Sequence, residues 1–227
     1  MENLDRKFWF STQIEPLNTQ LSKEIQRALL QTSRQLFVPS EYKNLVYTDE
    51  NLWISQYQHV LFSAFILEKL LVHIQPNPQH FVLEIGTGLG YFSCILAQLT
   101  HRVLSLDSSL ENIKHATQKA LHLNLRNLHC LEIKNFLNPY HLYNHRPSAG
   151  FNTIVITGQL PYLPSFLLEL LGYNGQIIYI LPFKTFSQVL KYEYDYQQQT
   201  WKQNFLFYAD FPVLARSKES RHVEFLL

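Results

Sequence analysis

The spacing in this chain that most directly suggests a ligand-binding site is that of three glycines at alternate positions, Gly86, Gly88 and Gly90. They are three of only seven glycines in the sequence, and they follow an apolar run, Phe81–Ile85, that carries a single acid, Glu84. Glycine lets the backbone approach a ligand closely and adopt a positive φ without strain. A strand, a glycine loop and the start of a helix together form a site for a nucleotide-like ligand, and the sequence predicts one here.

The spacing of the glycines narrows the class of ligand. Dinucleotide-binding folds use G-x-G-x-x-G, which places a pyrophosphate at the helix N-terminus, whereas this chain has G-x-G-x-G. Glu84 stands two residues before the first glycine, and the loop contains no basic residue. This pattern favours a ligand with a cationic or ammonium-bearing part over a diphosphate. The alternative is a glycine loop that serves only as a tight turn.

A second acid, Asp107, ends the next apolar run, Val103–Asp107. A carboxylate at the tip of this strand can accept hydrogen bonds from both hydroxyls of a ribose. We therefore expect Glu84, the glycine loop and Asp107 to meet at the carboxyl edge of two adjacent strands, where open sheets bind ligands. In the alternative interpretation Asp107 only complements a helix dipole, with Ser108 or Ser109 as the helix cap.

Alternating strand and helix patterns must position these residues. Strands are predicted at 81–85, 102–107, 128–133, 151–157 and 175–181. Helices are predicted at 90–99, 109–123 and 163–171. This alternation predicts a parallel sheet covered by helices on both faces. A C-terminal hairpin, formed by Gln188–Tyr194 and Asn204–Phe211, is expected to close the sheet edge.

The N-terminal part of the chain follows a different pattern. Apolar residues recur with helical spacing over Asn18–Thr32, and residues 51–63 are expected to form a loop that enters a helix ending near Ile74. Two prolines then separate this part from the first strand. We therefore divide the chain into a helical N-terminal extension with the loop, residues 1–78, and a compact α/β domain, residues 79–227.

Composition excludes several classes of protein. Hydrophobic residues make up 46% and charged residues 16%, as in globular domains. The formal net charge of +1 gives no electrostatic reason to expect a nucleic-acid or acidic membrane partner.

Cys94 and Cys130 lack metal-ligand spacing and are expected to be small buried hydrophobes. No apolar run reaches the ~18 residues of a membrane span. The first residues lack the layout of a signal peptide, so we expect a cytoplasmic protein of undetermined oligomeric state.

Several segments together resemble one family, the protein-L-isoaspartate O-methyltransferases, which depend on S-adenosyl-L-methionine. The run Val82–Tyr91 is nearly that family's first motif, V-L-E-I-G-T-G-S-G-Y. Phe37–Pro39 with Tyr47–Asp49 is similar to its F-V-P and A-Y-x-D segments. Phe151–Thr157 resembles its F-D-A-I-I-V-T strand, and Gly175–Pro182 its G-G-x-L-V-I-P strand. The stretch Leu160–Pro164 stands where the family has P-x-x-P, and the match spans most of residues 18–185.

The resemblance implies a fold and a cofactor site. The fold is a Rossmann-like class I methyltransferase: a mostly parallel sheet of about seven strands with one antiparallel strand near an edge, helices on both faces and a helical N-terminal extension. The cofactor is S-adenosyl-L-methionine, whose sulfonium fits the cationic ligand expected above. The methionine moiety would be held by Glu84, Gly86, Thr87, Gly88 and Gly90. Asp107 would hold the ribose, and Asn135 would offer an amide on the adenine side, where the family's acid is replaced by Lys134.

The chain departs from the family mainly in the acceptor loop, where the family reads P-I-G-x-G-Q-T-x-S-Q-P. In the ungapped register Gln58 is retained, His59 replaces the threonine and Leu61 replaces the characteristic serine. Ser55 and Tyr57 stand where the family has glycines. A shifted register that restores the serine at Ser55 needs a deletion and an insertion. The catalytic residues are therefore unassigned, with Gln58 and His59 as candidates; His59 would orient or deprotonate an acceptor, or be a surface loop residue.

Three hypotheses for function follow. In the first, the chain methylates the α-carboxyl of isoaspartyl residues in damaged proteins or peptides, with S-adenosyl-L-methionine as donor. In the second it keeps the cofactor and uses a different acceptor. In the third it is a non-catalytic interaction protein on the same fold. Its partner surface would then be an aromatic set in the loop and tail: Trp53, Tyr57, Trp201, Phe205 and Phe207.

Overall fold

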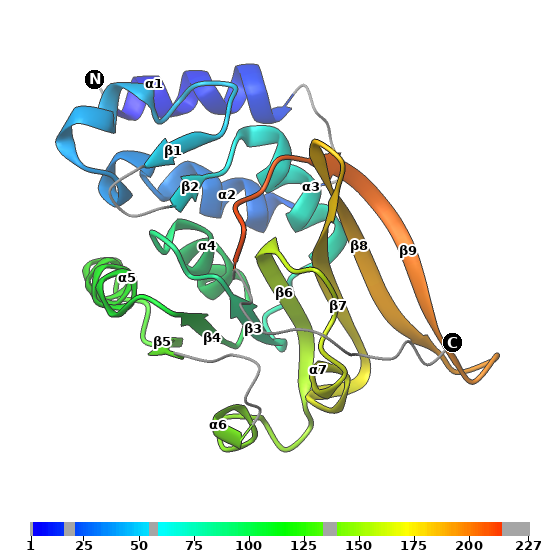
Figure 1. The fold of residues 1–227 in the computed structure, drawn as a ribbon. Coiled ribbons are helices and arrows are strands. Elements are labelled where there is room, and N and C mark those ends of the chain that lie inside the picture. The colour runs from blue at the N-terminus through cyan, green and yellow to red at the C-terminus, as the bar shows by residue number, and fades with distance from the viewer. Residues whose placement is uncertain (1, 16–20, 55–58, 134–139, 215–227) are drawn as a thin grey trace.

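The computed structural model describes residues 2–15, 21–54, 59–133 and 140–214 (Figure 1). Its main sheet has seven strands in the order β5-β4-β3-β6-β7-β8-β9. They are β3 (Phe81–Ile85), β4 (Arg102–Asp107), β5 (Leu128–Glu132), β6 (Phe151–Gln159), β7 (Leu171–Phe183), β8 (Phe186–Asp195) and β9 (Thr200–Ala209). Neighbours from β5 to β7 are parallel, whereas β8 is antiparallel to both β7 and β9. The predicted sheet, with one antiparallel strand beside its edge, is confirmed.

Helices cover both faces of this sheet, as predicted. They are α3 (Ala64–Ile74), α4 (Tyr91–Leu99), α5 (Leu110–His122), α6 (Tyr140–Tyr143) and α7 (Phe166–Glu169). Successive residues of β3 enter opposite cores, since side chains alternate along a strand. Val82 packs in the core that contains α3 and α4, whereas Leu83 and Ile85 pack in the core that contains α6 and α7. Burial of both faces explains why this strand is a continuous apolar run interrupted only by Glu84.

The N-terminal part is helical and packs against the α3–α4 face. It contains α1 (Glu2–Trp9), a π-helical turn η1 (Phe10–Ile14), α2 (Lys23–Gln31) and the 3-10 turns η3 (Arg34–Phe37) and η4 (Ser40–Leu45). Ser22 caps α2 by accepting from the Ile25 amide at 3.3 Å. Leu29 of α2 and Ile95 of α4 belong to one core. The division of the chain at residue 78 stays a prediction, because this core includes residues from both sides of it.

The segment 51–63 differs from its prediction as a loop. It contains a two-stranded antiparallel hairpin, β1 (Leu52–Ile54) and β2 (His59–Leu61), which pairs with no strand of the main sheet (Figure 1). Ile54 and Leu61 are buried and anchor it to the core. Strands of three residues are too short to show a readable alternation, which is why the sequence did not reveal them. The helix that follows ends at Ile74, as predicted.

The predicted helix at 163–171 is wrong in length. Only Phe166–Glu169 is α-helical, because the chain is then drawn into the sheet. The Phe151 amide donates to the Leu170 carbonyl at 2.9 Å, and Leu171 already pairs with Phe151 as the first residue of β7. The C-terminal hairpin is confirmed, with β8 and β9 slightly longer and shifted relative to their predicted bounds.

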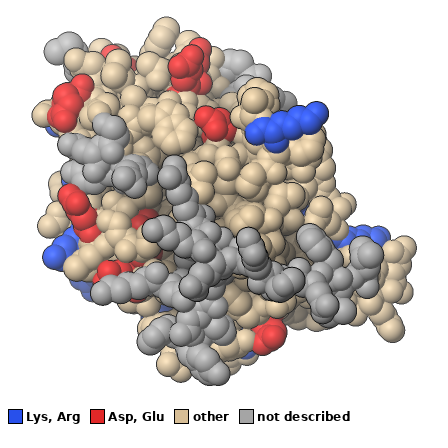
Figure 2. Space-filling view, in the orientation of Figure 1, with Lys and Arg blue, Asp and Glu red and all other residues tan. Residues whose placement is uncertain are grey.

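Two observations concern the surface and the helices of the described residues. None of the described helices has the length and apolar character needed to cross a membrane. On the face of the molecule in Figure 2, the described acidic and basic side chains are scattered and form no basic patch.

Candidate functional site

The candidate site lies at the carboxyl ends of β3 and β4, where the glycine loop leads from β3 into α4. The amides of Gly86 and Thr87 both donate to the Leu106 carbonyl, at 2.7 and 3.0 Å, so the loop is fastened to β4. Gly86, Gly88 and Gly90 have φ of 110°, 55° and 83°. These values lie in the region that residues with a Cβ rarely adopt, which explains the three glycines in conformational terms.

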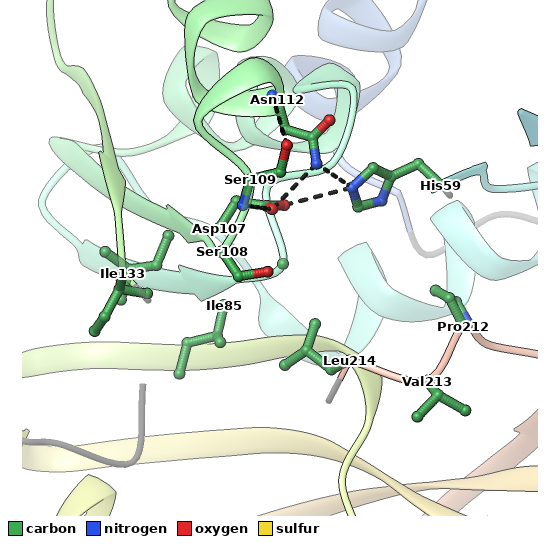
Figure 3. A pocket seen from close by; sticks show the side chains of 12 residues that line it. His59, Ile85, Asp107, Ser108, Ser109, Asn112, Ile133, Pro212, Val213 and Leu214 are labelled. Carbon is green, nitrogen blue, oxygen red and sulfur yellow. Dashed lines mark hydrogen bonds and ion pairs between the residues drawn. The ribbon is translucent and has the colours of Figure 1, made fainter. Parts of the chain in front are cut away.

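Asp107 joins this loop to the start of α5 (Figure 3). Its Oδ2 accepts from the Gly88 amide at 2.9 Å, and its Oδ1 accepts from the Ser109 amide at 2.9 Å and from Asn112 Nδ2 at 3.1 Å. Ser109 caps α5, one of the two residues predicted for that role. Asp107 is therefore a helix N-terminal acid and also a carboxylate at the glycine loop, so the two interpretations of this residue are compatible.

Glu84 lies beside the loop, where it lines a small cavity together with Thr87, Gly88 and His59. Its side chain is almost fully buried, and its Oε2 accepts from the hydroxyls of Ser93 and, at 2.6 Å, Ser105. Burial raises the pKa of Glu84 to about 7, although the hydrogen bonds from Ser105 and Ser93 act in the opposite direction. Thr87 joins the same network, with its Oγ1 2.6 Å from the Ser105 hydroxyl. Glu84 and Thr87 thus brace the loop from the core side.

Sequence reasoning missed Ser93 and Ser105. Each is a hydroxyl residue within an otherwise apolar run, Ser93 in α4 and Ser105 in β4, and both are completely buried. A buried polar side chain needs a partner, so an isolated serine in such a run is a signal that a second polar group faces it. Here that group is the Glu84 carboxyl.

The three glycines serve different contacts. A Cβ on Gly90 would lie 2.6 Å from the Cβ of Ala116, so this glycine permits close packing of the loop against α5. A Cβ on Gly88 would lie 2.9 Å from His59 Nδ1, and one on Gly86 would meet Thr157 Oγ1 first and lie 2.9 Å from Leu214 Cδ1. Gly86 and Gly88 are therefore each covered by a side chain that comes from outside the motif.

His59 reaches the site from β2. Its Nε2 is 2.5 Å from Asn112 Nδ2 and 3.5 Å from Asp107 Oδ2, as the dashed lines in Figure 3 show. Its side chain is only 18% exposed, so it does not lie free on the surface. Burial lowers the pKa of His59 below its ordinary value, and the Asp107 carboxylate opposes that shift.

The segment that follows β9 covers the other side of the loop. Gln159, at the end of β6, donates its backbone N–H to the Pro212 carbonyl at 2.7 Å, and its backbone carbonyl accepts from the Leu214 N–H at 3.2 Å. These bonds hold Leu214 against Gly86 and Gly158. No sequence pattern indicated this contact, because it joins two segments more than fifty residues apart.

A hollow of about 140 Å³ remains between these parts (Figure 3). Asp107, Ser108 and Asn112 line one side of it, Ile133 lines the end of β5, and His59 and Leu214 lie across the other side. The structure thus brings together the predicted Gly86, Asp107 and His59 around one cavity, with Gly88 beneath the ring of His59. Gln58 and Asn135, and with them Ser55, Tyr57 and Lys134, lie outside the described residues.

Comparison with known proteins decides the family. The sequence profile of the protein-L-isoaspartate(D-aspartate) O-methyltransferases (PCMT) matches residues 12–213. The chain belongs to this family. The predicted family and the enzyme class, a methyltransferase, are confirmed.

Individual relatives agree with this assignment. The protein-L-isoaspartate O-methyltransferase of Picosynechococcus sp. is 29% identical over 164 residues, which are 72% of this chain and 70% of that protein. That of Synechococcus sp. is 30% identical over 66% of this chain and 59% of that protein. A Plasmodium falciparum chain assigned as a protein-L-isoaspartate O-methyltransferase, solved in complex with S-adenosyl-L-homocysteine, superposes with a TM-score of 0.72. At 15% identity, over 94% of this chain and 98% of that one, it confirms the Rossmann-like methyltransferase fold.

Proposed function

We propose that the chain transfers a methyl group from S-adenosyl-L-methionine to the α-carboxyl of isoaspartyl residues in protein or peptide substrates. The observation that carries the proposal is the buried Asp107 carboxylate, bonded to the Gly88 amide at the mouth of a hollow beside the glycine loop. Membership of the isoaspartyl methyltransferase family supports the acceptor.

The residues around the hollow suit this cofactor. Asp107 can accept hydrogen bonds from the ribose hydroxyls, and Gly86 and Gly88 carry no side chains, so the backbone would offer the methionine part a close approach once the His59 ring and Leu214 side chain that cover it are displaced. Ser108 and Ile133 line the same hollow as Asp107 and would face the adenine. S-adenosyl-L-methionine, when bound, supplies a methyl group already activated by the positive sulfonium.

The chain then needs to orient the acceptor and exclude water, rather than to move a proton. A substrate carboxyl group is ionised at neutral pH, so its oxygen is already a nucleophile. Alignment of two bound reactants contributes much of the rate in such a transfer. Glu84 is unsuited to act as a base for the acceptor, because it is buried and bonded to two serines. Its role is to hold the loop in shape, while Leu214 and Pro212 shield the reacting groups from water.

A methyl-transfer assay tests this function. Labelled S-adenosyl-L-methionine is incubated with the protein and a peptide that contains L-isoaspartate, with the same peptide containing normal aspartate as control. We expect label in a base-labile ester on the isoaspartyl peptide only. Cofactor binding without transfer to this peptide would remove the acceptor and leave the second hypothesis, a methyltransferase with another acceptor. A failure to bind the cofactor would leave the non-catalytic hypothesis.

We also propose a cytoplasmic location. Cys94 and Cys130 are both unpaired, and Cys94 is buried in the core. Disulfides are rare in cytosolic proteins, so two free cysteines are compatible with this location. Fractionation of cells that express the native protein would test this, and recovery in the periplasm or an oxidising organelle would contradict it.

A further inference from the structure

The ring of His59 fills the space beside the two groups that the cofactor needs, the Asp107 carboxylate and the Gly88 backbone. Its imidazole lies beside Asp107, with Nε2 3.5 Å from Oδ2, and it stands over Gly88 closely enough that a Cβ there would meet Nδ1 at 2.9 Å. Asn112 holds the same ring nitrogen at 2.5 Å (Figure 3). A ribose on Asp107 and a methionine chain over Gly88 would have to take the place of this ring.

The volume of the hollow leads to the same conclusion. Pockets for ligands of this size have volumes of roughly 300–1,000 Å³. The hollow has about 140 Å³, with His59 forming part of its wall. The cofactor therefore cannot enter fully while His59 keeps this position.

The hairpin that carries His59 is fastened to the core, so the ring leaves the site by rotation of the His59 side chain. Among the described strands β1 and β2 pair only with each other, but Ile54, which pairs with His59, is fully buried in the core and holds this part of the hairpin in place. Its base is fastened, since Asn51 accepts from the Ser63 amide at 2.8 Å and donates to the Asp210 carbonyl at 2.9 Å. Displacement of His59 thus breaks its contacts with Asp107 and Asn112 and leaves the base in place.

We propose that His59 is a latch on the methyl-donor site, which lowers the affinity for S-adenosyl-L-methionine and for its product by occupying the space beside Asp107 and over Gly88. This inference rests on the proposed function, because it assumes that the cofactor binds at Asp107 and Gly88. His59 is then a residue that sets cofactor affinity, a role different from the acceptor-activating role that the sequence suggested.

Calorimetric titration with S-adenosyl-L-homocysteine tests the latch in three proteins: the wild type, His59→Ala and the control His122→Ala. His122 is exposed at the end of α5 and lies outside the site. We expect His59→Ala to bind about tenfold more tightly, the effect of roughly one hydrogen bond, and the control to match the wild type. Equal or weaker binding by a folded His59→Ala protein overturns the latch and leaves the proposed function intact. Binding in none of the three overturns the proposed function itself.

A second measurement uses the wild type alone, so that it does not depend on how the variant folds. Imidazole signals of isotopically labelled protein are followed by NMR, with His59 and His122 assigned by triple-resonance experiments on the wild type. Addition of S-adenosyl-L-homocysteine should move the His59 signals toward those of a solvent-exposed histidine, while the His122 signals stay in place. Saturation with the ligand without any change at His59 contradicts the latch.

Discussion

The floor and the cover of the candidate site are held in different ways. The floor is the glycine loop with Glu84 and Asp107, and its polar atoms are bonded to one another and to the core strands β3 and β4. The cover consists of the β1–β2 hairpin and the segment 211–214, which reach the loop mainly through the side chains of His59 and Leu214. Because the floor is tied to the core strands and the cover depends on a few side-chain contacts, we expect the floor to determine what binds and the cover to determine how easily it enters.

The largest effect is expected from Gly88→Val, which damages the floor at the point where the cover rests on it. Valine would be strained at a φ of 55° and would meet the His59 ring. We expect methyl transfer to fall by at least about 100-fold, since small misplacements of reacting groups cost that much. Transfer from labelled cofactor to the isoaspartyl peptide measures it, with circular dichroism to verify folding. Retention of activity within a factor of ten in a folded variant would contradict this role for the loop.

The stability of the base of the β1–β2 hairpin should depend on Arg34. This fully buried side chain donates from Nε to the Val46 carbonyl at 2.5 Å and from Nη2 to the Phe62 carbonyl at 2.7 Å. Its guanidinium also lies 5.0 Å from the ring centroid of Trp9. Arg34→Met leaves both carbonyls without this donor, at about 1–3 kcal/mol each, so we expect a loss of roughly 3 kcal/mol in the free energy of unfolding.

Urea denaturation of Arg34→Met measures this loss. Arg27→Met, on the exposed face of α2, is the matched control and should change stability by less than about 0.5 kcal/mol. If the two variants were equally stable, the hairpin base would not depend on the buried arginine.

Much of the floor could be predicted from the sequence, and almost none of the cover. β3, the glycine loop and the start of α4 are consecutive in the chain, and their residue types express local requirements: apolar residues for a doubly covered strand, glycines for positive φ. The position of Asp107 follows from its place at the end of the next parallel strand. His59 reached Asp107, and Leu214 reached Gly86, through contacts between distant segments, and no local pattern encodes such contacts. The bonds of Glu84 to Ser93 and Ser105 were also not predicted, because they join residues from two further elements, α4 and β4; the expected contact of Glu84 with the methionine moiety stays a prediction.

The pH dependence of the protein's stability tests whether Glu84 is buried in the floor as described. The pKa of Glu84 is raised to about 7 in the folded protein, from an ordinary value of 4.5, so the folded state holds this proton more tightly than the unfolded state. Its contribution to stability is therefore present below pH 4.5 and is lost as the pH rises through 7. At about 1.4 kcal/mol per pKa unit, the wild type should lose about 3 kcal/mol over this range relative to Glu84→Gln.

The measurement is urea denaturation of the wild type and of Glu84→Gln at several pH values. The difference between their unfolding free energies carries the result, because other titrating groups contribute equally to both. A difference that stays constant with pH would mean that Glu84 is not the buried, loop-bracing acid described above.

The smallest change in stability and in cofactor affinity is expected from Leu214→Ala, in the C-terminal part of the cover. Leu214 contacts Gly86 and Gly158 through apolar atoms and makes no bond to Asp107. Truncation should lower stability by about 1 kcal/mol, since the residue is only half-buried. It should change the affinity for S-adenosyl-L-homocysteine by less than His59→Ala does, and calorimetry on the two variants compares them. A larger gain in affinity from Leu214→Ala would identify the C-terminal segment, rather than the hairpin, as the main barrier to entry.

The central claim is that Asp107 and the glycine loop form the methyl-donor site beneath the His59 cover. Calorimetry with S-adenosyl-L-homocysteine in the His59→Ala background tests it most directly, because the latch then no longer obscures the contribution of Asp107. We expect binding of one molecule per chain and, when Asp107→Ala is added, an affinity at least about tenfold weaker, as for the loss of one or more hydrogen bonds to a charged group. An unchanged affinity after loss of Asp107, or no binding at millimolar ligand even without His59, would contradict it.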